Sequence, residues 1–516
     1  MSPADDDNQD RRRGKGPYSG LYDPLVANNA RVLHPPRAVR RAGDSFDTTV
    51  YVADALLFRE FPDGPLFDTF RGFLSTADLG LIDEIAGHDR EVWERAQGLD
   101  GEAAEVLRRT WVTPVRLVVA ERTAAPVDAW AVLQAFRASI EGPDVYRVGL
   151  AHLVSADIRG ATMTAGGTMT AGGTMTAGGT MTAGGTMTAG GGVRFQYAVP
   201  GLGGRTPVSY LGPAPTPRKL RHRAPVVAVL DTGIGAHGWL VDDLVVEPAP
   251  TEAATGQGDE PEGTGRVLAP LEGLIDDYSG HGTFIAGILR QRCPEASIVM
   301  IKVMQADGFV PEDSMVRAIT QLAVDHLSGA RVIDALSMSF GYYHEEPDDQ
   351  KTDATLIGPL SALAAAGVGL FASAGNDATD RPMYPAAFSR SIPLISVGAL
   401  NPNGSVALFS NSGPWVTAWD WGAQVLSTQP TTFRGGLRPS AGTQDPHAGR
   451  TRESLDPDDF GQGFATWSGT SFAAPGVAGR FLRALIDVRD EQAAPEKLGE
   501  PRAALKAALR ELPRPD

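Results

Sequence analysis

From Ala224 onward the chain alternates short apolar runs with segments of helical periodicity, and this alternation restricts the fold more than any other feature. The apolar runs are rich in β-branched residues and almost uninterrupted, which is typical of strands buried on both faces of a parallel sheet. We therefore predict an α/β domain over residues 224–516, with a parallel sheet flanked by helices on both faces and with C-terminal helices. The predicted strands are 226–230, 298–304, 331–340, 368–374 and 392–400, and the predicted helices are 281–289, 311–327 and 354–366.

The chain before residue 224 has a different organisation. Residues 1–45 are polar and rich in Arg, Asp and Pro, so we predict a disordered N-terminal tail. Residues 46–212 are predicted to form a small α+β domain, and the proline-rich, basic segment 213–223 is predicted to be a linker. The elements expected in the α+β domain are a strand near 48–53, a helix near 79–96, a strand at 115–120, a helix over 127–140 and a strand at 146–150.

Residues 162–191, inside the predicted α+β domain, are five copies of Thr-Met-Thr-Ala-Gly-Gly. Two interpretations stay open: a flexible tether, because two glycines in every copy make ordering costly, or a β-solenoid of short period. Strands are expected on both sides, at 150–158 and 193–197, so the repeat is predicted to be an enlarged hairpin loop. A second hairpin, with its turn at 201–205, is expected to end near Tyr210.

Charge and cysteine content narrow the class of function. The formal net charge of −16 disfavours nucleic acid or an anionic membrane as the main partner. The single cysteine, Cys293, excludes an intrachain disulfide, indicates a reducing compartment and is expected to be a buried or incidental thiol. No secretory signal and no run of about 18 apolar residues is visible. We therefore predict a soluble, cytoplasmic protein that binds neither nucleic acid nor a membrane, with its oligomeric state left open.

Four polar residues stand at the ends of predicted strands and helices, each in a motif that contains glycine. Asp231 follows the strand 226–230 in Asp-Thr-Gly, His281 opens a helix in Gly-His-Gly-Thr, Asn376 follows a strand in Ala-Gly-Asn, and Ser471 begins an apolar helix in Gly-Thr-Ser. Taken singly, each has a structural explanation, as a turn carboxylate, a packing histidine, an Asx turn or a helix N-cap. Because catalytic groups in such sheets gather at the carboxyl ends of the strands, we predict that the four form one site.

These residue types are the ones that acyl transfer needs. A serine at a helix N-terminus lies where unpaired backbone N–H groups favour a developing negative charge. A histidine can act as its base, a carboxylate can orient that base, and a side-chain amide can donate to the oxyanion. An aspartic protease, the other class with Asp-Thr-Gly, would require a second such triplet, which the sequence lacks.

On these motifs, the segment from about 224 to 490 resembles the subtilisin-like serine proteases. The matching motifs are Asp231-Thr232-Gly233, Gly280-His281-Gly282-Thr283, Ala374-Gly375-Asn376 and Gly469-Thr470-Ser471-x-Ala473-x-Pro475. The resemblance implies a subtilisin-like fold and a serine endopeptidase that cleaves polypeptides through an acyl-enzyme. It also implies that Ser471 is the nucleophile, His281 the general base, Asp231 the orienting acid, and Asn376 with the Ser471 N–H the oxyanion donors. We expect no cofactor and no metal, since residues 290–297 lack the loop that carries a calcium site in secreted members.

The resemblance further implies a substrate cleft lined by Ser339, Phe340, Gly341, Ala372, Ser373 and Ala374. Met383 would form the floor of the pocket for the side chain before the scissile bond, which predicts a preference for apolar or aromatic residues there. Two departures from the family pattern stand out: Phe284 replaces a frequent second histidine, and an expanded polar loop covers 429–463. The loop either gates the cleft or is disordered.

Two functional hypotheses follow. The first is an active serine endopeptidase, and the second is a scaffold or regulatory protein whose protease fold is held inactive by its N-terminal domain. That domain is either a propeptide removed by self-cleavage, with Arg218 to Arg223 as the exposed cutting site, or a permanent adaptor that recruits substrates. It carries no catalytic constellation, and His152, isolated in the sequence, is expected to have a surface or packing role.

Overall fold

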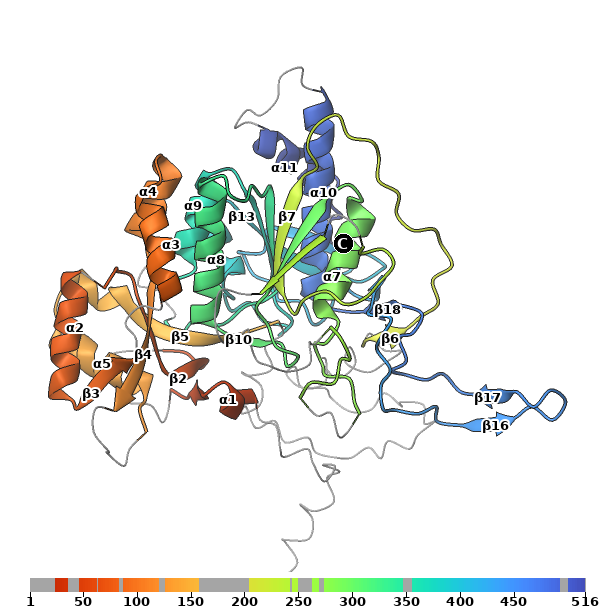
Figure 1. Cartoon of the computed structure of the whole chain (residues 1–516), viewed down its shortest axis with the longest axis horizontal. Helices are drawn as coiled ribbons and strands as arrows, with labels where there is room; N and C mark the ends of the chain where they lie inside the picture. Colours follow the sequence, from red (N-terminus) through yellow and green to blue (C-terminus); the bar gives the residue numbers. More distant parts are fainter. Residues whose placement is uncertain are drawn as a thin grey trace, which may run out of the picture.

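The computed structural model describes residues 24–35, 46–62, 64–82, 87–119, 126–156, 204–241, 244–248, 262–268, 273–346, 355–491 and 500–515. The Thr-Met-Thr-Ala-Gly-Gly repeat and the predicted strand 193–197 lie outside these residues. The described chain has two parts, here called the N-terminal unit (24–156) and the C-terminal domain (204–515). Figure 1 shows the N-terminal unit packed against one side of the C-terminal domain.

A seven-stranded sheet forms the centre of the C-terminal domain. Its strands lie in the order β14 (Ala418–Trp421), β13 (Leu394–Leu400), β12 (Gly369–Ser373), β11 (Ala335–Met338), β7 (Val226–Asp231), β9 (Ser297–Lys302) and β8 (Leu244–Pro248). Every neighbouring pair is parallel. Along β7, Val227 and Val229 join one hydrophobic cluster while Ala228 and Leu230 join another, so both faces of the sheet are buried. The predicted parallel sheet is confirmed.

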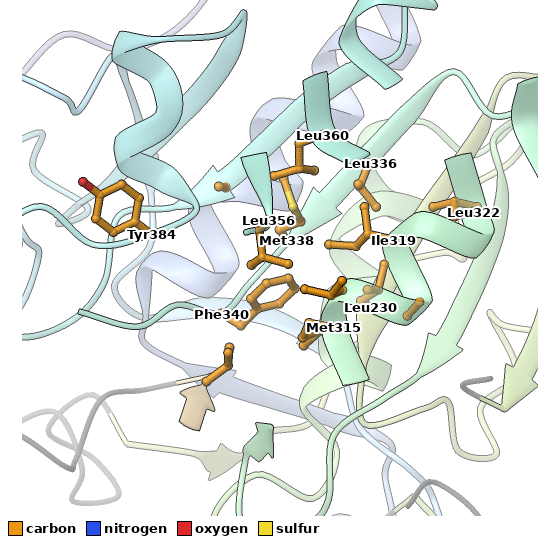
Figure 2. Packing of buried hydrophobic residues seen from close by; sticks show 14 of the residues in the cluster. Leu230, Met315, Ile319, Leu322, Leu336, Met338, Phe340, Leu356, Leu360 and Tyr384 are labelled. Atoms are coloured by element: carbon orange, nitrogen blue, oxygen red, sulfur yellow. The ribbon is translucent and has the colours of Figure 1, made fainter. Parts of the chain in front are cut away.

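Helices cover both faces of this sheet, as predicted (Figure 1). One face carries α7 (His281–Arg292), α10 (Thr470–Glu491) and α11 (Glu500–Arg510), and the other carries α8 (Glu312–Leu327) and α9 (Ile357–Ala365). Figure 2 shows the second face, where the Phe340 ring lies between Met315 of α8 and Leu356 beside α9. Within the described residues, no helix combines the length and the apolar character needed to cross a membrane.

The N-terminal unit is built on a second sheet of six strands, five of its own and β10 (Phe309–Pro311) of the C-terminal domain. The strands lie in the order β10-β5-β2-β4-β3, and β1 pairs with β2. Its strands are β1 (Ala30–Leu33), β2 (Thr49–Phe58), β3 (Leu79–Ile82), β4 (Thr113–Val119) and β5 (Val148–Ser155). Its helices are α1 (Pro24–Ala27), α2 (Pro65–Thr76), α3 (Gly87–Gln97), α4 (Glu102–Arg109) and α5 (Ala129–Ser139). The predicted β-α-β segment is β4-α5-β5, and β2 lies between its two strands, antiparallel to both.

Three predictions for the N-terminal half are wrong. Residues 79–82 form a strand instead of the start of a helix, because they pair with β4, and α2 and α4 were not predicted. Residues 24–35 of the predicted disordered tail form α1 and β1, since pairing with β2 buries Leu33. The predicted α+β domain extends too far, to 212, because β6 (Thr206–Pro207) pairs with β18 (Phe464–Trp467) of the C-terminal domain. The first strand of the hairpin predicted to end near Tyr210 lies outside the described residues.

The expanded loop 429–463 follows β15 (Val425–Thr428) and is part of the described chain. It carries an antiparallel pair, β16 (Gly442–Gln444) and β17 (Thr451–Glu453), which extends away from the body of the protein in Figure 1. The buried rings of Phe433 and Phe460 attach the base of the loop to the core. The loop is therefore structured, contrary to one of the two alternatives expected from its composition.

The two parts of the chain are joined by a sheet and by a core. β10 (Phe309–Pro311), from the C-terminal domain, pairs antiparallel with β5 and so becomes the edge strand of the N-terminal sheet. Val52 and Leu57 of β2 belong to the same hydrophobic cluster as Met315 and Leu360 of the C-terminal domain. Burial of apolar surface and backbone pairing both hold the N-terminal unit in place.

Candidate active site

The candidate site lies at the carboxyl ends of three neighbouring strands. Asp231 is the last residue of β7, Ser339 directly follows β11, and Asn376 follows the end of β12. His281 is the first residue of α7 and Ser471 the second residue of α10. The predicted catalytic residues therefore all stand at the strand or helix ends where the sequence motifs placed them.

Asp231 and His281 form a buried pair. The Nδ1 atom of His281 lies 2.9 Å from each carboxylate oxygen of Asp231, and the backbone N–H of Thr232 donates to the same carboxylate at 2.8 Å. The exposed fraction is 0% for Asp231 and 2% for His281. Engaging Nδ1 in this way fixes the ring orientation and leaves Nε2 as the nitrogen that can accept a proton.

The glycines on either side of His281 are required by close packing. Gly280 has a φ of +84°, in the left-handed region, and a Cβ there would overlap the side chain of Gln429. A Cβ on Gly282 would overlap the carbonyl of Gly233 and lie 3.2 Å from the Asp231 carboxylate. The Gly-His-Gly sequence thus lets α7 begin directly against the loop that follows β7.

Ser471 lies in the first turn of α10, and its carbonyl has an unusual partner. Pro475 lacks the N–H that would normally donate to the carbonyl four residues earlier, which is that of Ser471. The hydroxyl of Ser339 donates to this carbonyl at 2.9 Å instead. The proline therefore lies beyond the first turn, where a missing N–H leaves an acceptor, and β11 supplies the donor.

The amide of Asn376 is oriented by the residue before the candidate nucleophile. Its Oδ1 accepts from the backbone N–H and the hydroxyl of Thr470, at 2.8 and 2.9 Å. The same hydroxyl accepts from the N–H of Gly375 at 3.0 Å. With Oδ1 engaged by Thr470, the Nδ2 group is the donor that remains for a ligand beside the N-terminus of α10.

Among the described residues, the Ser471 hydroxyl is hydrogen-bonded to the N-terminal unit. It donates to the carbonyl of Ala156 at 3.4 Å, and no hydrogen bond to His281 is present among the described residues. The ring of Phe472, next to Ser471, lies 5.4 Å from the His281 ring between centroids. The histidine and the start of α10 are thus in contact, while the hydroxyl points to the chain that follows β5.

The residues predicted to line a cleft lie around the ends of β11 and β12, but not all of them face Ser471. Ser339 and Gly341 face Ser471 and β5, since Gly341 exchanges two backbone hydrogen bonds with Ser155, of 3.0 and 2.8 Å. Phe340 turns into the core, as Figure 2 shows. Ala372, Ser373 and Ala374 are buried at the end of β12. Met383 is 2% exposed and fills the space beside Gly341 and Gly375, between the two strand ends.

His152 joins the N-terminal unit to the C-terminal domain through a buried charged cluster. Its Nδ1 lies 2.6 Å from Glu312 and its Nε2 lies 2.8 Å from Glu345. The hydroxyl of Thr355 donates to Glu312 at 2.6 Å, and the His152 ring stacks on Tyr342 at 4.5 Å. The surface alternative expected for His152 is therefore wrong, and the packing alternative is confirmed. The ion pairs were not predicted, because their partners come from distant parts of the sequence.

The charges of this cluster shift its pKa values strongly. Burial alone would lower the pKa of His152, but the carboxylates of Glu312 and Glu345 outweigh burial and raise it to about 10. Burial alone would raise the pKa of Glu345, but the charges of His344 and His152 bring it well below its usual range. Among the described residues, His152, His344 and Glu345 also have ligand atoms within 4.8 Å of one another, as a metal site requires. In the structure these atoms are engaged in the ion pairs.

Cys293 takes no part in this chemistry. Its side chain is buried and forms no disulfide, as predicted. Burial, with a smaller contribution from Glu295, raises its pKa to about 12, so the thiolate form is disfavoured.

Comparison with known proteins identifies the family of the C-terminal domain. The model of the subtilase family matches residues 222–509. An intracellular serine protease of Paenibacillus polymyxa is 28% identical over 270 residues, which are 50% of this chain and 66% of the relative. The major intracellular serine protease of Bacillus subtilis is 26% identical over 299 residues, 56% of this chain and 76% of the relative.

Solved structures match this chain at lower sequence identity. The crystal structure of a lanthipeptide protease is 19% identical, with a TM-score of 0.39, and the match covers 54% of this chain and 77% of that protein. The family match extends over more than half of the chain and includes Asp231, His281, Asn376 and Ser471. The protein belongs to the subtilase family of serine-type peptidases.

Proposed function

We propose that the protein is a serine endopeptidase that hydrolyses polypeptides through an acyl-enzyme on Ser471. The observation that carries this proposal is the 2.9 Å pairing of His281 Nδ1 with Asp231. His281 Nε2 would take the proton from Ser471 as the serine oxygen attacks the carbonyl carbon, and would then protonate the leaving amine. Asp231 would keep the ring oriented and stabilise the imidazolium.

The experiment that tests this function is labelling with a fluorophosphonate, which reacts with an activated serine. We expect a 1:1 adduct on Ser471 in the wild-type chain and none in His281→Ala, because the serine is then without a base. Equal labelling of the two proteins would contradict the proposed mechanism.

In this proposal the oxyanion binds between the backbone N–H of Ser471 and the amide of Asn376. Replacing Asn376 by alanine is expected to lower kcat about 100- to 1,000-fold with little change in KM, because the donor acts mainly in the transition state. Steady-state hydrolysis of a peptide substrate measures both constants. Asn403→Ala, in an exposed loop, is the matched control and should behave as wild type. A larger effect on KM than on kcat would assign Asn376 to substrate binding instead.

A second function, inhibition by the N-terminal unit, is favoured by the contact at Ser471. The end of β5, at Ser155, lies between β10 and Gly341. The N–H of Ala156 donates to the carbonyl of Gly308 at 2.9 Å, and the Ser471 hydroxyl donates to the Ala156 carbonyl. An extended segment in this position excludes another extended polypeptide from the same backbone groups. We therefore propose that the intact chain is held inactive until the N-terminal unit withdraws, and that Met383 beside this segment favours an apolar side chain in a substrate.

This arrangement changes the proposed position of self-cleavage. Arg218, in the predicted cutting site, is paired with Glu295 and with Asp487 near the end of α10. At a rise of about 1.5 Å per residue, Asp487 lies roughly 24 Å from Ser471 along that helix. Ala156, in contrast, touches the Ser471 hydroxyl. We propose that intramolecular cleavage, where it occurs, follows β5 and not the linker.

The His152 cluster gives the inhibition a pH dependence. The raised pKa of His152 means that its contribution to docking is complete below its ordinary value of 6.5 and is lost as the pH rises through about 10. The lowered pKa of Glu345 means that its contribution is present above 4.5 and is lost at more acidic pH. We expect the labelling rate of wild type, relative to that of His152→Ala, to rise by up to about tenfold per pH unit between 6.5 and 10. Dividing the two labelling rates removes the pH dependence of the catalytic residues, which both proteins share. A ratio that does not change with pH would contradict the role of the His152 cluster in docking.

We also propose a cytoplasmic location. The two relatives named above are described as intracellular, and the chain has a single cysteine.

A further inference from the structure

A second carboxyl group lies directly behind the Asp231–His281 pair. Glu262, which no motif marks in the sequence, is 2% exposed. It stands in the described segment 262–268, between β8 and α7. Its side chain contacts both the loop that follows β7 and the first turn of α7, the two segments that hold Asp231 and His281.

Glu262 binds these two segments through short hydrogen bonds. The hydroxyls of Thr232 and Thr283 each donate to it at 2.5 Å, one to each oxygen, and the N–H of Gly280 donates at 3.0 Å. Thr232 is the residue after Asp231, and Gly280 and Thr283 flank His281 in sequence. The carboxylate therefore ties the acid of the triad to the helix that carries the base.

The hydroxyl of Thr232 has two possible acceptors, and this couples Glu262 to Asp231. Its oxygen lies 2.5 Å from Glu262 and 3.2 Å from the Oδ1 of Asp231, and it accepts the N–H of Gly282 at 3.0 Å. It has only one proton to donate. While Glu262 is ionised, the proton is held by Glu262; once Glu262 is protonated, it can donate to Thr232, whose own proton then turns to Asp231.

We infer that Glu262 is a positioning residue for the catalytic pair, and that its charge state sets how strongly Asp231 supports the His281 imidazolium. This inference rests on the proposed peptidase function. Ionised Glu262 places a second negative charge behind the histidine and leaves Asp231 free of the Thr232 hydroxyl, and both effects favour the imidazolium. Protonated Glu262 reverses both effects and weakens the base.

Glu262 changes its charge near neutral pH. Burial raises the pKa of Glu262 to about 7, although the hydrogen bonds from Thr232 and Thr283 oppose the shift. The charged groups that face it are Asp231 of β7, which raises the pKa further, and Arg205, which lies across the loop before α7. The carbon chain of Lys302, from β9, approaches the same space beside Gly233.

The test is the pH dependence of the rate at which a fluorophosphonate labels Ser471 in the full chain. All the proteins compared carry His152→Ala, so that docking of the N-terminal unit adds no ionisation of its own, and the chain without a further substitution is the reference. In the reference we expect the acidic limb to contain two ionisations, that of the catalytic base and that of Glu262. In Glu262→Gln the acidic limb should contain one ionisation. The midpoint of the limb should lie roughly half a pH unit to one unit lower, and the plateau rate should be about tenfold lower. Each rate is divided by the fraction of folded protein, so a loss of stability alone does not move the midpoint.

A second variant shifts the same limb in the opposite direction. Thr283→Val removes a donor to the ionised carboxylate, so the pKa of Glu262 should rise and the limb should move to higher pH. Glu295→Gln is the matched control, since Glu295 is also a buried glutamate but lies past the other end of α7, paired with Arg218 and Arg483. Its profile should match that of the reference.

The possible results distinguish the peptidase proposal from the inference about Glu262. No labelling of the reference at any pH, although its N-terminal unit is released by His152→Ala, would overturn the peptidase proposal itself. Labelling of the reference with unchanged profiles in Glu262→Gln and Thr283→Val would overturn the inference about Glu262 alone. Opposite shifts in these two variants support it.

Discussion

Replacing Ser471 by alanine is expected to lower kcat for a peptide substrate by about a million-fold, the loss that follows when the nucleophile of such a triad is removed. The residual rate would come from the oxyanion donors and from substrate binding. The substitution removes only one long hydrogen bond, of 3.4 Å to Ala156, so the fold should be unaffected. Hydrolysis of an unstructured protein measures the loss. Ser468→Ala, three residues earlier, is the control, since its hydroxyl accepts only from the Gln424 N–H at 3.0 Å, outside the site.

The same variant reports on self-cleavage. If the chain cuts itself next to Ser471, the intact mass of wild type should fall and that of Ser471→Ala should not. The new terminus should lie directly after β5 and not between Arg218 and Arg223. A terminus within the linker would contradict the position that the Ala156 contact indicates.

Replacing His152 by alanine is expected to have the largest effect among substitutions outside the site. It would leave Glu312 and Glu345 facing each other across a buried interface without the cation that now lies between them at 2.6 and 2.8 Å. Removing one partner of a buried ion pair costs about 3–5 kcal/mol. The N-terminal unit should therefore open about 150- to 5,000-fold more often, and the fluorophosphonate should label Ser471 faster by a similar factor.

An exposed ion pair at the same interface provides the control. Arg95 of α3 binds Asp325 of α8, and the Arg95 side chain is 34% exposed. Exposed pairs contribute at most about 1 kcal/mol, so Arg95→Ala should accelerate labelling less than about fivefold. Equal rates for wild type and His152→Ala would show that this cluster does not hold the cleft closed.

The features predicted well from the sequence are those with a local cause. Uninterrupted β-branched runs such as 226–230 require burial on both faces, so the parallel sheet could be predicted. Asp231, His281, Asn376 and Ser471 each stand in a glycine motif. Beside the first three, at Gly233, Gly280 and Gly375, the backbone has a positive φ and passes close to another segment. The positions of these residues in the fold follow from that local geometry.

The features that were missed depend on contacts between distant segments. His152 meets Glu312 and Glu345 across 160 and 193 residues, and nothing near it in the sequence indicates a charged partner. Glu262 lies in a stretch without periodicity or motif, so only the fold reveals its place behind Asp231. The strand β1 has four residues, and its order comes from pairing with β2 more than from its own composition.

The most direct test of the central claim is to identify the residue that a fluorophosphonate modifies and to compare its rate of modification in three proteins. Peptide mass spectrometry should place the label on Ser471 alone in the wild-type chain. The rate should be about 150-fold higher or more in His152→Ala, and the label should be absent from His281→Ala. A label on another serine, or labelling of His281→Ala at the wild-type rate, would contradict a Ser471 nucleophile that is activated by His281 and covered by the N-terminal unit.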